Sequence, residues 1–123
     1  MKKKINSNKP IKKLLYLVDN KFKFEIIYLL TKNLQMRFGE IKIEQEIITQ
    51  QLLTKVLKEL ERDGIINRKK YSGFPRKVEY SLTSFGSSFK SIINAMIRWE
   101  EKNKKDINKQ FKKKKLYSIY DYY

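Results

Sequence analysis

The sequence predicts a mainly α-helical fold (α+β) that carries one small β-hairpin. Apolar residues recur at helical spacing over residues 10–63 and again over 84–99. Between these segments the period changes from 3.6 to 2, and a Ser-Gly-Phe-Pro tip joins two stretches rich in strand-forming residues. A chain of 123 residues is most simply one domain. We therefore expect a basic disordered segment over residues 1–9, a folded domain over 10–101 and a lysine-rich extension over 102–123.

Three helices are expected within residues 10–44. Pro10 is suited to open the first helix, because the N–H group that proline lacks would have no helical partner there. This helix should end near Asp19 and Asn20, and residues 21–33 should form the central core helix. The third helix is expected over residues 38–44, with Phe38 and Ile41 facing inward.

The fourth helix is expected from Thr49 to Asp63. Thr49 is a suitable N-cap, and Gly64 is the residue type that commonly follows a helix end. Its leucines and Val56 form one apolar face, and the opposite face carries Gln51, Thr54, Lys55, Lys58 and Arg62. Amides can pair with adenine, and cations can reach guanine or phosphate, so this face suits a helix that reads the major groove of DNA. An ordinary solvated surface helix would give the same pattern.

A basic hairpin is expected directly after this helix. Its strands should cover residues 65–71 and 76–82. Cationic side chains gather near its tip: Arg68, Lys69, Lys70, Arg76 and Lys77. Two helices joined by a short turn and followed by a basic hairpin form a winged helix-turn-helix. The alternative is a solvated hairpin whose lysines only confer solubility.

A last helix should begin at Thr83 or Ser84. Its apolar residues span too wide an arc for one packing surface on so small a domain. We therefore expect a homodimer held by the first and last helices, with a partner protein as the alternative. The expected dimer interface consists of Ile11, Leu14, Leu15, Phe89, Ile92, Ile93, Met96 and Trp99.

Composition excludes several classes of function. The formal charge of +16 points to a polyanion, with nucleic acid first and an acidic membrane surface second. The sequence has no cysteine and no histidine, which removes thiol chemistry and the usual zinc and imidazole sites. No nucleophile motif, glycine-rich phosphate loop or carboxylate pair suggests catalysis. We expect no enzyme, no cofactor and no metal. With no signal or transmembrane pattern, the protein should be soluble and cytoplasmic, with no membrane partner.

Several strings resemble the HxlR-type transcription regulators, a winged-helix family near the MarR-like proteins. They are RFGEI (37–41), ITQQLLTKVLKELERDGII (48–66), YSGFPRKVEYSLTSFG (71–86) and IRWEEK (97–102). The likeness covers residues 10–101. It implies a homodimer whose paired reading helices bind pseudo-palindromic double-stranded DNA. By position, it places Gln50, Gln51, Thr54 and Lys55 on the base-facing part of the helix, and residues 73–77, from Gly73 onward, on the wing.

The sequence departs from the family pattern at two places. Members commonly have a cysteine just before the proline that opens the first helix, and here Lys9 precedes Pro10. Thiol-based sensing therefore cannot be transferred to this chain. The usual Gly-Gly-Lys-Trp that enters the second helix is replaced by residues 19–22, Asp-Asn-Lys-Phe. The lysine-rich extension lies outside the resemblance.

The leading hypothesis is a sequence-specific, double-stranded-DNA-binding transcription regulator that acts as a homodimer. A basic RNA- or ribosome-associated winged-helix protein is the first alternative, and a protein-interaction module is the second. The amide and hydroxyl face of the fourth helix favours the first hypothesis, because RNA duplexes are read mainly by shape. A small-molecule effector is compatible with the sequence, which identifies none.

Overall fold

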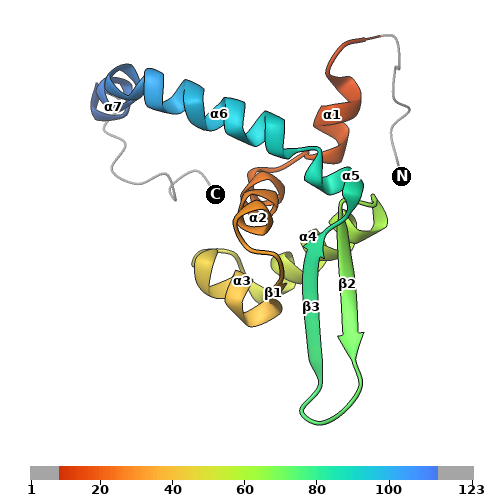
Figure 1. Cartoon of the computed structure of the whole chain (residues 1–123). Helices are drawn as coiled ribbons and strands as arrows, with labels where there is room; N and C mark the ends of the chain where they lie inside the picture. The colour runs from red at the N-terminus through yellow and green to blue at the C-terminus, as the bar shows by residue number, and fades with distance from the viewer. Residues whose placement is uncertain (1–8, 114–123) are drawn as a thin grey trace. The chain divides into compact units, whose positions relative to one another are not determined.

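The computed structural model describes residues 9–113 and confirms a mainly α-helical fold with a small antiparallel sheet (Figure 1). The chain divides into two compact units with a boundary between Phe89 and Lys90. Residues 1–8 of the expected basic segment and residues 114–123 of the expected extension lie outside the described residues. The first unit contains α1 (Lys12–Leu17), α2 (Lys21–Lys32), β1 (Met36–Arg37), α3 (Phe38–Glu44), α4 (Gln50–Arg62), β2 (Ile66–Tyr71), β3 (Lys77–Leu82) and α5 (Ser84–Ser87).

The core of the first unit lies between α2 and α4. Asn20 caps α2 by accepting a hydrogen bond from the Lys23 N–H group at 3.1 Å. α2 then buries Phe22, Ile26, Ile27 and Leu30, and α4 buries Leu53, Val56, Leu57 and Leu60. Both helices lie where the apolar periodicity predicts them, because each has one continuous apolar face to bury.

α4 ends at a glycine-dependent cap. Gly64 has φ 74°, a conformation that costs glycine little. Its N–H group donates to the Glu61 carbonyl at 3.0 Å, and the Ile65 N–H group donates to the Leu60 carbonyl at 2.9 Å. Leu60 and Ile65 are both fully buried. This pair of hydrogen bonds fixes the direction in which the chain leaves α4 and enters β2.

The sheet has three strands rather than the two of the predicted hairpin. β2 pairs with β3 as expected, from Ile66 opposite Leu82 to Tyr71 opposite Lys77. β1 pairs with the other edge of β3, so the strand order is β1-β3-β2. β1 has only two residues, which is too short for an alternating pattern to be visible in the sequence.

Thr83 and Gly86 attach the end of the hairpin to the end of α4. The Thr83 N–H group donates to the Ile65 carbonyl at 3.0 Å, and the Thr83 hydroxyl accepts from the Gly86 N–H group at 2.8 Å. A Cβ atom at position 86 would lie 2.0 Å from the Ile65 carbonyl oxygen, so only glycine allows this approach. The end of the hairpin that lies away from the tip is therefore attached to the C-terminal end of α4.

The expected continuous helix after Thr83 is wrong, because α5 ends at Ser87. The N–H groups of Ser88 and Phe89 donate to carbonyls only three residues earlier, on Phe85 and Gly86, which tightens the turn and ends the helix. Phe85 and Phe89 meet edge to face across this turn, with ring centroids 5.9 Å apart. The sequence shows no glycine or proline at this break, so the apolar periodicity alone suggested one helix.

The second unit, described by itself, contains α6 (Lys90–Lys102) and α7 (Lys104–Lys113). Asn103 separates them, and its side-chain amide donates to the Trp99 carbonyl at 2.8 Å. α7 covers part of the predicted extension. No helix among the described residues is long and apolar enough to cross a membrane.

Candidate nucleic-acid interface

The exposed face of α4 begins at its first turn. The Thr49 hydroxyl accepts from the Leu52 N–H group at 3.1 Å, so the helix starts at a fixed position. Gln50, Gln51, Lys55 and Lys58 are exposed, opposite the buried leucines. Their placement matches the face that the sequence predicts.

Thr54 is the least exposed of the predicted contact residues on α4. It is half-buried, and its hydroxyl donates to the Gln50 carbonyl at 2.9 Å. Its proton is therefore committed to the helix backbone, which leaves its oxygen as an acceptor and its methyl group for apolar contact. Thr54 can therefore contact a thymine methyl group, or accept a hydrogen bond from the amino group of adenine or cytosine.

A hollow of about 360 Å³ lies between α4 and the hairpin. Thr54 and Lys58 line it from α4, and Arg68 lines it from β2. Glu61 and Tyr80 also border it, so its lining carries both signs of charge. The fold thus brings three of the predicted contact residues onto one surface.

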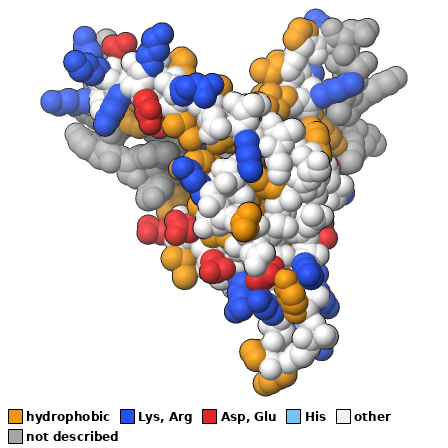
Figure 2. All heavy atoms as spheres, in the orientation of Figure 1, with side chains coloured by type: hydrophobic (Ala, Val, Ile, Leu, Met, Phe, Trp, Pro, Cys, Tyr) orange, Lys and Arg blue, Asp and Glu red, His pale blue; other side chains and the backbone are white. Residues whose placement is uncertain are grey.

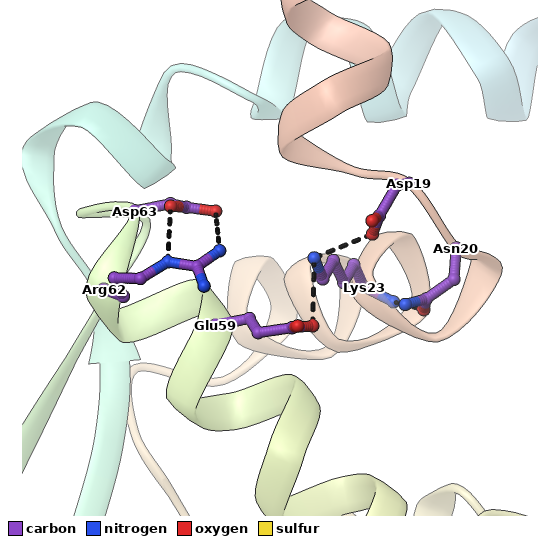
Figure 3. A network of polar contacts seen from close by, with 6 residues as sticks. All are labelled: Asp19, Asn20, Lys23, Glu59, Arg62 and Asp63. Atoms are coloured by element: carbon purple, nitrogen blue, oxygen red, sulfur yellow. Dashed lines mark hydrogen bonds and ion pairs between the residues drawn. The ribbon is translucent and has the colours of Figure 1, made fainter. Parts of the chain in front are cut away.

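Arg62 lies at the far end of the same helix face. Its Nε donates to the Asp63 carboxylate at 3.1 Å and its Nη2 at 3.3 Å (Figure 3). The hydrogen bond with Asp63 raises the pKa of the Arg62 guanidinium, and the charge of Asp63 adds to this effect. Since Arg62 already has an acidic partner, it offers less uncompensated charge to a phosphate than Lys55 or Lys58 does.

One hairpin cation pairs with a buried carboxylate. Glu79 is 8% exposed and accepts from the Tyr71 hydroxyl at 2.7 Å. Lys77 Nζ lies 3.2 Å from the other Glu79 oxygen. Lys69 and Lys77 also lie over the Tyr71 ring, at 4.8 Å and 4.9 Å from its centroid. We name Lys69, Tyr71, Lys77 and Glu79 the hairpin cluster.

The pKa of Glu79 is lowered by its neighbours. The hydrogen bond from Tyr71 is the largest cause, burial opposes it, and Lys77 and Arg37 act in the same direction as Tyr71. Arg37 is exposed on β1, opposite Glu79 in the ladder. It is a cation of this surface that sequence reasoning missed, because the strand that carries it has no periodic signal.

The remaining hairpin cations are exposed: Arg68, Lys70 and Arg76. Within the described part of the chain, no ion pair joins them to an acid. Gly73 lies at the tip with φ 115°, which allows the chain to turn there. Figure 2 shows Lys and Arg side chains near the hairpin and apolar side chains at its end.

The residues predicted for a dimer interface differ in exposure. In the first unit, Ile11 and Leu15 on the α1 side are 61% and 50% exposed, Leu14 is half-buried and Phe89 is buried. In α6, Met96 and Trp99 are 47% and 62% exposed, Ile92 is half-buried and Ile93 is buried.

Comparison with known proteins agrees with this architecture. Residues 17–108 match the model of the HxlR-like helix-turn-helix family. The chain is 42% identical over 100 residues to the transcriptional regulator YdeP of Bacillus subtilis, which covers 81% of this chain and 77% of YdeP. It is 40% identical over 106 residues to YybR of the same organism, with 84% of each chain covered.

The chain belongs to the HxlR-like helix-turn-helix family. Its relatives are DNA-binding transcription regulators rather than enzymes. Among solved structures, the reduced form of the redox regulator HypR is similar, with a TM-score of 0.76, 37% identity, and 82% of this chain and 99% of HypR covered. The reduced form of YodB from B. subtilis has a TM-score of 0.65 and 30% identity, with 76% and 91% covered. This sequence contains no cysteine, so its residues have no thiol with which to respond to oxidants.

Proposed function

We propose that this HxlR-like chain is a sequence-specific regulator that binds double-stranded DNA as a homodimer on a pseudo-palindromic operator. The observation that carries the proposal is the polar first half of α4, capped at Thr49 and seated on a buried leucine face beside the basic hairpin. In this arrangement Gln50 and Gln51 read bases in the major groove, while Lys55, Lys58 and the hairpin contact phosphates.

Selection of bound duplexes from a random pool tests sequence reading. The parent protein should enrich one motif with two related half-sites, because paired reading helices follow the symmetry of a dimer. Structured RNA should compete poorly. Equal competition by RNA, or no enriched motif, would contradict the proposal.

Gln51→Ala tests the role of the helix face. It should remove roughly 1–3 kcal/mol of discrimination at one base position, because the amide can pair with one base edge. Lys58→Ala is the matched control, and it should weaken binding to all sequences similarly. If Gln51→Ala retains the parental motif at equal stringency, Gln51 does not read bases.

The homodimer is proposed from the apolar side chains of α6. Met96 and Trp99 are large and exposed in the single chain, and such residues are commonly covered by a partner. Trp99→Glu should shift the protein towards monomers in sedimentation, because it would place a carboxylate in an apolar interface. Lys102→Glu, which alters charge but no apolar surface on the same helix, is the control. A monomeric parent at micromolar concentration would contradict the dimer.

A further inference from the structure

The tip of the hairpin exposes an aromatic side chain. Phe74 is 99% exposed, the highest exposure of any large apolar residue among those the structure describes. It lies between Gly73 and Pro75, at the turn that joins β2 to β3. Single exposed apolar residues are common on proteins and carry no meaning alone.

Two exposed cationic residues lie close to Phe74 along the hairpin. Arg76 follows Pro75 directly, and Lys70 lies on β2 near the same tip, opposite Val78. Both are exposed, and neither has an ion-pair partner within the described residues. The tip therefore carries an exposed apolar side chain, and the chain on both sides of it carries cations that are unpaired within the described residues. This pattern complements a groove whose two edges carry phosphates and whose floor carries base edges.

Side-chain contacts hold β2 and β3 together directly below the tip. Tyr71 and Lys77 form the last pair of the β2–β3 ladder. Tyr71 donates to Glu79 at 2.7 Å, and Lys77 lies over its ring, so the strands are held together directly below the turn. At the other end of the hairpin, Thr83 is bonded to the end of α4. An apolar group on such a support can enter a groove in a fixed register relative to α4.

We propose that Phe74 is an apolar wedge that enters the minor groove of duplex DNA beside the major-groove contact of α4. Arg76 and Lys70 contact the phosphates on either side, and the phenyl ring packs against sugars and a partly unstacked base step. This inference rests on the proposed function and deepens it. It adds a specificity determinant, because pyrimidine–purine steps unstack more easily than A-tract steps. The site should thus favour a pyrimidine–purine step at a position that α4 does not touch.

The experiment uses the full-length protein and the duplex that binding-site selection yields. In a series of duplexes, 2-aminopurine replaces one base at a time in the base steps next to the segment that α4 contacts. Its fluorescence rises when the base is unstacked. The parent should raise the signal at one step, and Phe74→Ala should abolish that rise. Phe74→Ala should also bind roughly tenfold more weakly, because one aromatic contact is lost. Its salt dependence should be unchanged, since it loses no phosphate contact.

Two variants serve as controls. Leu34→Ala removes another apolar side chain that is 92% exposed, and it should bind as the parent does. Phe74→Leu retains an apolar wedge and should recover part of both the affinity and the fluorescence signal. The thermal stability of all three variants should equal that of the parent, because neither position is buried.

The outcomes separate the wedge from the underlying function. A parent that selects a motif but raises no 2-aminopurine signal would overturn the wedge alone. If Phe74→Ala binds the duplex with the affinity of the parent, the wedge is also overturned. The exposed tip would then be a contact site for a protein partner. Failure of the parent to select any duplex would overturn the proposed function, and the wedge with it.

Discussion

Lys23 and Lys77 each lie close to a glutamate, at 3.3 Å from Glu59 and 3.2 Å from Glu79. The side chain of Lys23 is 2% exposed, whereas that of Lys77 is 37% exposed. Lys23 also lies 2.8 Å from Asp19, so it joins the turn before α2 to the C-terminal half of α4 (Figure 3). Similar contacts thus serve different purposes. The buried lysine links α4 to the start of α2 within the core, and the exposed one stays accessible to solvent on the hairpin.

The burial of Lys23 explains why it needs two acids. A lysine is rarely buried in full unless its charge is paired, because the ammonium group loses its hydration. The two acids remain accessible to water, since the Asp19 side chain is 60% exposed and that of Glu59 is 25% exposed. Removing the acids and removing the lysine should therefore have unequal effects.

The largest effect is expected from the double variant Asp19→Asn and Glu59→Gln. It leaves the Lys23 ammonium buried without a counter-charge, which should lower the free energy of unfolding by about 3 kcal/mol. Lys23→Met should change it by less than about 1 kcal/mol, because the acids left behind are solvated and methionine has a similar volume. Urea denaturation measures both. Equal losses in the two proteins would contradict the assignment of the cost to the buried charge.

The next prediction concerns which hairpin cation meets DNA. Arg76 has no acidic partner within the described residues, while Lys77 is paired with Glu79 and lies over Tyr71. Arg76→Ala should therefore reduce the slope of log affinity against log salt by about 0.9, which corresponds to one phosphate contact. Lys77→Ala should reduce it less. Titration of the selected duplex at several salt concentrations gives the slopes, and a larger change for Lys77→Ala would contradict this ranking.

Sequence reasoning succeeded where the determinants are local. The span of α4 followed from its apolar period, its Thr49 cap and Gly64, all of which act within a few residues of the helix. It failed where the local structure depends on a residue or strand far away in the sequence. β1 exists because β3 offers a free edge, and Lys23 is buried because Glu59, 36 residues further along the chain, joins the nearby Asp19 in pairing its charge.

The same distinction applies to the candidate site. The exposed face of α4 and the basic hairpin could be predicted from the order of side chains. Which cations are already paired could not be predicted, since only the strand register brings Lys77 into an ion pair with Glu79 and places Arg37 opposite it. The exposed ring of Phe74 was visible in the sequence as part of a turn, but its isolation from the core required the structure.

The smallest expected effect lies in the acid stability of the hairpin cluster. The pKa of Glu79 is lowered in the folded protein, chiefly by the hydrogen bond from Tyr71. A carboxyl group with a depressed folded pKa contributes stability above its unfolded value, near 4.5, and that contribution is lost as the pH falls through the folded value. The parent should therefore be more stable than Glu79→Gln at neutral pH, and the gap should close below pH 4.5.

Tyr71→Phe sharpens this test, because it removes the strongest cause of the shift and leaves Lys77 in place. Its stability should lie between those of the parent and Glu79→Gln at neutral pH, and the three curves should converge in acid. Melting temperatures recorded from neutral pH downward supply the comparison. Parallel curves for all three proteins would mean that Glu79 titrates alike in the folded and unfolded chains. In that case the cluster would arrange the hairpin cations without adding a pH-dependent contribution to stability.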